Sequence, residues 1–239
     1  MYERFEVRHF RGFDKLQLSR LAKVNLIAGK NNVGKTALLE ALFLHAGGYN
    51  AELAIRVNAL RGIEPTANNN GQTSAGLWQN PFHGLDTERE VQLLGVKRSA
   101  AQSTQWEVRL RLLGAPEDLA QVRMVLSQGG KNSHLPTIQP RPVLELRTLM
   151  NGESRSFFAI LESFGIRLEP LPPPPMLPAF FRFASVPIPQ KEVADWFSKL
   201  VIEKRQGLIL DCLREIDPRL EDIRLVARGG EALLYGDMG

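Results

Sequence analysis

The segment from Gly29 to Thr36 constrains this chain more than any other part of its sequence. It reads GKNNVGKT and matches the pattern G-x-x-x-x-G-K-[ST] of a phosphate-binding loop. At average residue usage, four fixed positions match by chance in roughly one chain of this length in a hundred. Apolar residues precede the loop at 24–28 and follow it at 36–46. This order predicts a buried strand, a loop and a buried helix, in which backbone N–H groups and the positive end of the helix dipole surround a phosphate.

Each residue type in the loop has a chemical reason. Glycine lets the backbone approach the phosphates closely, and asparagine tolerates the left-handed conformations of a tight loop. The Lys35 ammonium can supply charge to the β- and γ-phosphates, and the Thr36 hydroxyl can bind Mg²⁺. The alternative is a glycine turn that merely precedes a helix. We expect Lys35 to be catalytic and the loop to bind nucleotide through Gly29, Asn31, Asn32, Val33, Gly34, Lys35, Thr36 and Ala37.

The pattern of apolar residues predicts a mixture of strands and helices. Strands are predicted at 5–9, 16–18, 24–28, 90–96, 106–113, 142–149 and 180–186, and a hairpin at 223–237. Helices are predicted at 36–46, 51–63, 116–127 and 191–211, and a polar loop at 68–72. Residues 170–178, PLPPPPMLP, favour polyproline II and predict a stiff linker, with a ligand for an aromatic groove as the alternative.

Composition and charge exclude several classes of protein. No apolar run approaches the roughly 18 residues of a membrane span, the start lacks a signal peptide, and Cys212 alone cannot form an intrachain disulfide. We therefore expect a cytoplasmic protein without a membrane partner. Residues 1–35 carry eight basic and three acidic residues, a local charge of +5, whereas the whole chain carries +4. Positive charge confined to one end favours a localised polyanion, such as nucleotide phosphates, over a long basic track for DNA.

Two further stretches near the loop carry a family resemblance. Phe10-Arg11-Gly12-Phe13 precedes the loop, and LLEALF follows it at 38–43. Together with the G-x-N-N-x-G-K-T loop, they resemble the ABC-type ATPase heads of the SMC, RecF and OLD-like group, and most closely the OLD-like prokaryotic ATPases, several of which serve in phage defence. The specific similarity to this family covers residues 1–46. Weaker similarities to the family follow at 82–86, 217–221 and 235–237.

The resemblance implies a two-lobed head that binds ATP and Mg²⁺ and forms a homodimer head to head. By the same resemblance, Arg11 would contact the nucleotide, with a surface arginine beside a turn as the alternative. Gln190 could match the family glutamine near Mg²⁺, although an ordinary glutamine at a helix start is the favoured interpretation. The implied fold is an α/β P-loop NTPase with α+β character in the N-terminal lobe, a mixed sheet around the loop helix and an antiparallel lobe.

The acidic pair that such an ATPase needs is not evident in the sequence. Leu208 to Asp211 has the apolar residues and the first acidic residue of such a pair. However, Cys212 stands where the second acidic residue should be, and the spacing of the apolar residues is helical. Tyr235 to Asp237, in the predicted hairpin, has no following glutamate. We therefore expect an N-terminal portion of a head, incomplete at its C-terminus, with weak or no turnover by itself. The expected divisions are a loop core at 1–48, a variable lobe at 49–178, and a return to the core at 179–239.

The sequence is compatible with three functions. The first is an ATP-driven module that dimerises on nucleotide and licenses an effector, such as a nuclease acting on nucleic acid. The second is a nonhydrolysing nucleotide-binding scaffold or regulatory subunit, with the region 50–155 as a partner surface. The third is a small-molecule kinase or GTPase, and a GTPase is disfavoured because no N-K-x-D sequence is present.

Overall fold

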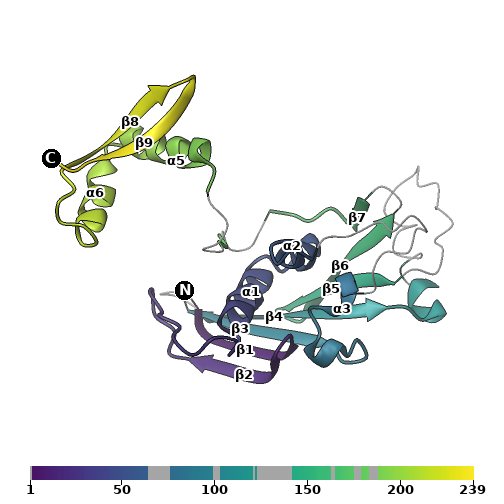
Figure 1. Ribbon diagram of the computed structural model, residues 1–239. Helices are drawn as coiled ribbons and strands as arrows, with labels where there is room; N and C mark the ends of the chain where they lie inside the picture. Colours follow the sequence, from purple (N-terminus) through teal and green to yellow (C-terminus); the bar gives the residue numbers. More distant parts are fainter. Residues whose placement is uncertain are drawn as a thin grey trace. The chain divides into compact units, whose positions relative to one another are not determined.

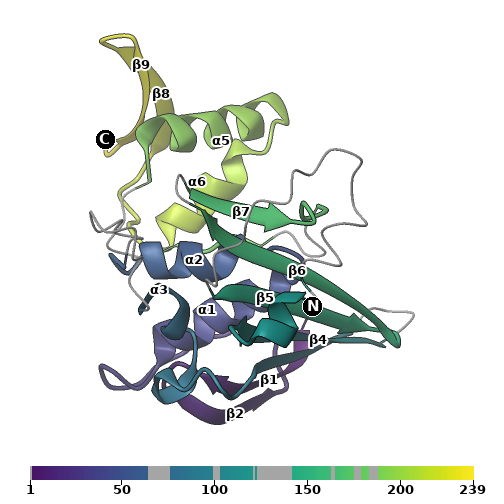
Figure 2. The same ribbon diagram turned by 90° about the vertical axis from the view of Figure 1, so that its right-hand side faces the viewer.

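The computed structural model describes residues 2–63, 76–98, 103–120, 122, 142–162, 165–174, 179–182 and 188–239. The chain divides into two compact units, Met1–Phe181 and Arg182–Gly239, which are described separately (Figures 1 and 2). The predicted polar loop at 68–72 lies outside the described residues. In the helix predicted at 116–127, residues 116–120 and 122 are helical. Residues 121 and 123–127 lie outside the described residues.

A seven-stranded sheet in the order β2-β1-β3-β4-β5-β6-β7 forms the centre of the first unit (Figure 1). Its strands are β1 (Tyr2–Phe10), β2 (Phe13–Ser19), β3 (Val91–Arg98), β4 (Ser103–Leu113), β5 (Val143–Met150), β6 (Glu153–Glu162) and β7 (Gly165–Glu169). Every neighbouring pair is antiparallel. The described part of the chain is therefore a mixed α and β fold with an antiparallel sheet, and the expected mixed sheet around the loop helix is not found among these strands. Strands from the predicted core at 1–48 and the predicted lobe at 49–178 share this one sheet, and the three-part division remains a prediction.

The strand predicted at 24–28 is wrong. These residues have no regular secondary structure, and Val24 and Leu26 are 87% and 93% exposed. A short apolar run predicts a strand only where a neighbouring strand can accept its backbone hydrogen bonds. Within the described residues, no backbone hydrogen bond joins 24–28 to another segment.

Five other strand predictions in this unit are confirmed, and two strands were not predicted. The predictions at 5–9, 16–18, 90–96, 106–113 and 142–149 correspond to β1 to β5. The two strands that the sequence did not predict are β6 and β7. Residues 170–174 of the proline-rich segment and residues 180–182 of the predicted strand at 180–186 have no helix or strand, and the rest of both segments lies outside the described residues.

Short helices complete the first unit. Besides the helical residues 116–120 and 122, they are α1 (Lys35–Ala46), α2 (Glu52–Ala59), α3 (Gly76–Gln79) and the 3₁₀ turn η1 (His83–Leu85). The predictions at 36–46 and 51–63 are thus confirmed, the second with a shorter helix. Helix α1 packs on β1 and β3, and α2 packs beside α1 (Figures 1 and 2). None of the described helices is long and apolar enough to cross a bilayer.

The two faces of the sheet differ because successive strand residues point to opposite sides. On the α1 face, Phe5, Val7, Leu93 and Val108 are fully buried in the main core. The opposite face carries a smaller cluster beneath the helical residues near 119, formed by Leu113, Leu119, Val122, Val143, Phe158 and Ile160. Burial of apolar side chains on both faces accounts for much of the stability of the sheet, at about 25 cal/mol per Å² of apolar surface.

His45 joins the last turn of α1 to the sheet. Its ring stacks on Trp106 with centroids 4.4 Å apart. Its Nε2 donates to the Trp106 carbonyl oxygen at 3.1 Å, and its Nδ1 accepts from the Tyr2 hydroxyl at 2.7 Å. Burial lowers the pKa of His45 to about 4. The neutral imidazole with its proton on Nε2 therefore fixes the C-terminal end of α1 on β1 and β4.

The second unit contains two helices and a hairpin. Its elements are α5 (Gln190–Ile202), α6 (Gln206–Arg214), β8 (Asp222–Arg228) and β9 (Glu231–Asp237). The predicted hairpin is confirmed, and Gly229 and Gly230 form its turn with φ of 62° and 84°. The helix predicted from 191 to 211 and beyond is confirmed over most of its length, but it is interrupted at 203–205, where Lys204 takes a left-handed φ of 56°. Helix α5 packs on β9 through a small core that includes Ala194 and Phe197.

Candidate nucleotide-binding site

The glycine-rich loop leads directly into α1, as its sequence predicts. Gly34 caps the helix with φ of 95°, and Asn32 takes a left-handed φ of 64°. The Leu38 N–H donates to the Gly34 carbonyl oxygen at 2.9 Å, which is the first bond of the helix. Gly34 offers no side-chain cap, and the first turn of α1 has no acidic residue. This helix end therefore presents N–H groups and partial positive charge without a competing carboxylate, as an anion site requires.

Lys35 folds back over the loop. Its Nζ donates to the carbonyl oxygens of Gly29 at 2.7 Å and Lys30 at 2.6 Å. The ammonium group therefore lies at the first residues of the loop, although it belongs to the helix that follows. Lys35 and Thr36 are partly exposed at the start of α1, Ala37 is buried, and Val33 is 53% exposed. The predicted loop residues are thus assembled in one place with their lysine among them.

The turn between β1 and β2 packs against this loop. A Cβ atom added at Gly34 would lie 2.6 Å from Cζ of Phe13, so the phenyl ring occupies the space that a side chain would need. A Cβ added at Gly29 would lie 3.2 Å from a methyl group of Val33. Only glycine fits at Gly34, because both the positive φ and the neighbouring ring exclude larger residues. Phe13, two residues after Arg11 at the start of β2, is therefore in contact with the phosphate-binding loop.

Arg11 ion-pairs with a buried carboxylate on α1. Its Nε lies 2.7 Å from Oε2 of Glu40, and Nε of Arg61 lies 2.6 Å from Oε1 of the same carboxylate. Glu40 is fully buried, whereas the Arg11 and Arg61 side chains are 10% and 33% exposed. The Arg11 Nη2 also donates to Oδ1 of Asn58 at 3.0 Å. Burial lowers the pKa of Arg11, and the Glu40 carboxylate opposes that change.

The other sequence candidates lie elsewhere. Gln190 is the first residue of α5 in the second unit, so it does begin a helix, and its proposed role near Mg²⁺ remains a prediction. Asp211 lies within α6, as its helical spacing predicted, and not at the end of a strand. No group of three or more histidine, cysteine or acidic residues suited to a metal ion occurs among the described residues.

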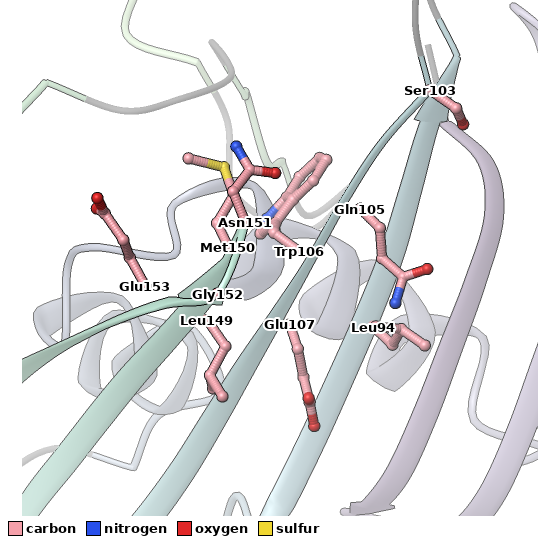
Figure 3. A pocket seen from close by; sticks show the side chains of 10 residues that line it. All are labelled: Leu94, Ser103, Gln105, Trp106, Glu107, Leu149, Met150, Asn151, Gly152 and Glu153. Carbon is pink, nitrogen blue, oxygen red and sulfur yellow. The ribbon is translucent and has the colours of Figure 1, made fainter.

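A separate hollow of about 500 Å³ lies where β4 projects past the end of β5 (Figure 3). Figure 3 shows Trp106 and Met150 on one side of the sheet and Glu107 and Leu149 on the other. The full lining is Leu94, Ser103, Gln105, Trp106, Glu107, Leu149, Met150, Asn151, Gly152 and Glu153. Its two carboxylates do not converge on one point, so the hollow lacks the arrangement that acid–base chemistry needs.

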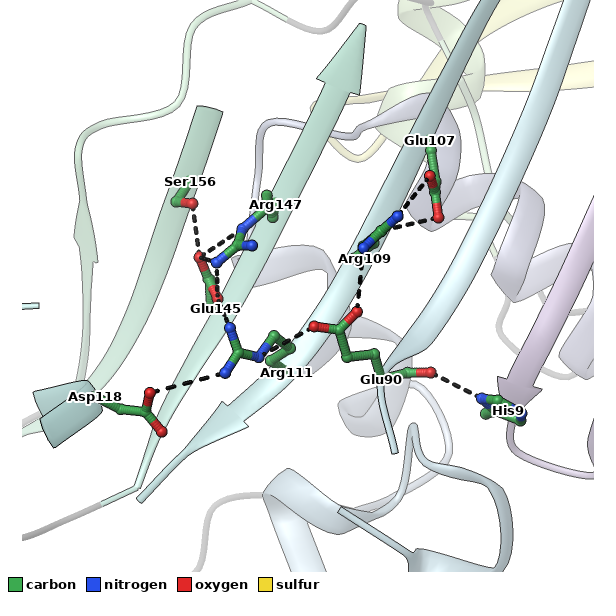
Figure 4. A network of polar contacts seen from close by, with 9 residues as sticks. All are labelled: His9, Glu90, Glu107, Arg109, Arg111, Asp118, Glu145, Arg147 and Ser156. Carbon is green, nitrogen blue, oxygen red and sulfur yellow. Dashed lines mark hydrogen bonds and ion pairs between the residues drawn. The ribbon is translucent and has the colours of Figure 1, made fainter. Parts of the chain in front are cut away.

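A network of arginines and carboxylates covers the face of the sheet opposite α1 (Figure 4). Glu145 accepts from Oγ of Ser156 at 2.6 Å and from Nη2 of Arg147 at 2.9 Å. Glu90 joins Arg111, with its Oε1 3.2 Å from the Arg111 Nε. The arginines of this network are balanced by carboxylates, so the face is not a continuous cationic surface of the kind that binds long nucleic acids.

Comparison with known proteins gives short, partial similarities. No protein-family model matches the chain. An uncharacterised protein of Methanocaldococcus jannaschii is 48% identical over 44 residues, which is 18% of this chain and 20% of that protein. The DNA replication and repair protein RecF of Idiomarina loihiensis is 48% identical over 42 residues, 18% of this chain and 12% of RecF. An ATP/GTP phosphatase of Helicobacter pylori is 31% identical over 94 residues, 39% of this chain and 24% of that protein.

These matches span at most about a quarter of the relatives they involve, with 24% as the largest share. The chain therefore shares short segments with RecF and with an ATP/GTP phosphatase. The loop follows from its sequence, but the contacts that surround it do not. In the sequence, Phe13 belongs to the motif before the loop and Glu40 is the polar residue of an apolar helix, and neither position indicates these contacts or the part of Arg61 in them. The one available signal was Glu40 itself, because a carboxylate on an otherwise buried helix needs a cationic partner.

Proposed function

We propose that this chain is the ATP-binding module of an ABC-type ATPase. The observation that carries the proposal is the loop from Gly29 to Thr36, with Lys35 folded over its first carbonyls at the uncapped start of α1. A helix N-terminus and a glycine-rich loop together bind phosphate through backbone N–H groups. The partial similarities to RecF and to an ATP/GTP phosphatase support the same class of ligand.

Mg²⁺ would be held by the hydroxyl of Thr36 in the first turn of α1. The fit rests on the donor chemistry, because a hydroxyl oxygen beside phosphate oxygens suits a hard cation that keeps several waters. When bound, the ion neutralises phosphate charge and orients the β- and γ-phosphates. Gln190, the first residue of α5, keeps only the role that the family resemblance implies for it.

Lys35 would exchange its two carbonyl partners for phosphate oxygens. This exchange replaces neutral acceptors by anionic ones, and charge-assisted hydrogen bonds are roughly twice as strong as neutral ones. Arg11 would add a second cation on the side of α1 that faces the β1–β2 turn. These groups bind and orient a triphosphate, and the carboxylates that hydrolysis needs are not identified among the described residues.

The proposed wider role is a head that forms a homodimer when nucleotide binds and drives a coupled effector in nucleic-acid processing or phage defence, in the cytoplasm. A nonhydrolysing scaffold is the second candidate function. This candidate is favoured by the position of Asp211 within helix α6. Asp211 therefore cannot be the carboxylate at the end of a strand that hydrolysis needs. A small-molecule kinase is the least supported alternative.

Isothermal titration calorimetry with ATP and ADP, with and without Mg²⁺, tests the proposal. We expect micromolar, Mg²⁺-dependent binding that Lys35→Ala abolishes. Binding that Lys35→Ala leaves unchanged would contradict the proposal, because the ligand would then lie outside the loop. Phosphate release measured on the same samples separates an ATPase from a scaffold, and phosphate found on an acceptor would indicate a kinase.

A further inference from the structure

Glu40 connects the phosphate-binding loop to two arginines from other parts of the fold. It lies four residues after Thr36 on α1. Residues four apart on a helix are neighbours on one face, with Cβ atoms about 5–6 Å apart, and their side chains tilt toward the helix N-terminus. The Glu40 carboxylate and its partners therefore lie roughly one helical turn from the residue proposed to hold Mg²⁺.

The group formed by Arg11, Glu40 and Arg61, called here the Arg11 triad, carries an excess of positive charge. One carboxylate serves two guanidinium groups, and Arg61 binds it with both Nε at 2.6 Å and Nη2 at 3.1 Å. Within the described residues, no other carboxylate lies within ion-pairing distance of either arginine. The triad therefore has a net charge of +1 in a mostly buried place, where charge is screened less than at the surface.

The backbone of Arg11 is held so that the triad keeps this arrangement. Arg11 takes a left-handed φ of 50°. Its N–H donates to the Pro81 carbonyl oxygen at 3.0 Å, and its own carbonyl oxygen accepts from Nδ1 of His83 at 2.7 Å. A non-glycine residue keeps such a conformation only where its surroundings fix it, and such positions cluster at functional sites.

We propose that Glu40 and Arg61 are positioning residues of the nucleotide site, which hold Arg11 in a net-cationic triad beneath the phosphates and so favour ATP over ADP. The inference rests on the proposed nucleotide binding. Arg61 has the decisive part, because it supplies the charge that Glu40 would otherwise cancel. MgATP carries one more negative charge than MgADP, so the triad stabilises bound MgATP more.

The test compares three variants of the full chain by titration calorimetry with MgATP and with MgADP. Arg61→Met removes the charge, Arg61→Lys keeps it, and Arg56→Met is the matched control, since Arg56 lies on α2 in an exposed pair with Glu52. We expect Arg61→Met to weaken MgATP about fivefold and MgADP about twofold. Arg61→Lys should restore the ratio of the two affinities to that of the wild type, and Arg56→Met should leave both affinities unchanged.

Thermal unfolding of the same samples separates positioning from a purely structural role. Equal losses for both nucleotides, together with a lower unfolding midpoint, would overturn the proposal, and so would affinities that do not respond to Arg61→Met. Arg61→Gln, which keeps a donor for Glu40 without the charge, replaces Arg61→Met if that variant does not fold. Binding that Lys35→Ala abolishes but that the Arg61 variants leave unchanged would overturn this inference alone. Absence of nucleotide binding by the wild type would overturn the proposed function as well.

Discussion

The Nζ atom of Lys35 lies 2.7 Å from the carbonyl oxygen of Gly29, so the side chain of the seventh loop residue reaches back to the first. The contact closes the loop around the ammonium group. The two carbonyl partners of the lysine are weaker acceptors than the phosphate oxygens of the proposed ligand.

Lys35→Ala should remove nucleotide binding while leaving the fold intact. Lys35 is partly exposed and its side-chain bonds are to exposed loop carbonyls, so we expect the free energy of unfolding to change by no more than about 0.5 kcal/mol. Urea unfolding measures this change, and calorimetry measures the loss of binding. A large loss of stability would show that the lysine holds the loop together and is not primarily a ligand contact.

Gly34→Ala should destabilise the protein and disturb the loop. The added Cβ would meet Cζ of Phe13 at 2.6 Å, and the φ of 95° disfavours any side chain. Overpacking and left-handed strain together predict a loss of about 2–4 kcal/mol. Gly12→Ala is the control, since a Cβ there has no atom within 4 Å. Similar unfolding midpoints for the two variants would contradict the contact between Phe13 and Gly34.

Glu40→Gln should cost far more stability than the same change at Glu52. Glu40 is fully buried between two arginines, and loss of one partner from a buried ion pair costs about 3–5 kcal/mol. Glu52 pairs with Arg56 at the surface, where such a pair contributes about 0.5 kcal/mol. Chemical denaturation of both variants measures the difference. Equal effects would show that Glu40 is not buried as described.

Stability should fall as the pH is lowered from about 6.5 to about 4, in part because of His45. Burial lowers the His45 pKa from 6.5 to about 4, so over this range the unfolded chain binds a proton that the folded chain does not. The contribution of neutral His45 is fully present above pH 6.5 and is lost toward pH 4, by up to about 3 kcal/mol.

Denaturant titrations at several pH values, on the wild type and on His45→Gln, measure this contribution. The difference between the two proteins isolates His45 from the other histidines. We expect the variant to show a shallower dependence on pH in this range. Identical slopes would mean that the His45 ring is accessible to protons in the folded state.

Local sequence patterns predicted most of the secondary structure of the first unit. Where they were wrong, the outcome depended on whether a neighbouring strand was present. Alternation identified β1 and β2, strand-like composition identified β3 to β5, and the loop sequence identified the start of α1, because these signals lie within a few consecutive residues. The apolar run at 24–28 contained the same signal as a buried strand, yet Val24 and Leu26 are exposed because no described strand lies beside them. A sequence pattern reports what a segment can bury and cannot report whether a partner is present.

Some residues of the candidate site could likewise be predicted from the sequence, and others could not. Gly29, Gly34, Lys35 and Thr36 follow from a motif with fixed spacing, so the sequence alone was sufficient. The triad depends on residues 11, 40 and 61, which the fold brings together from a turn, a helix and the segment after α2. No spacing rule links such positions, and they became visible only in the structure.

A crystal structure of the protein with Mg²⁺ and a nonhydrolysable ATP analogue tests the central claim most directly. We predict that backbone N–H groups of residues 31–36 surround the β-phosphate and that Nζ of Lys35 leaves the Gly29 and Lys30 carbonyls for phosphate oxygens. An analogue bound elsewhere, or a loop without ligand in which Lys35 keeps both carbonyl contacts, would contradict it.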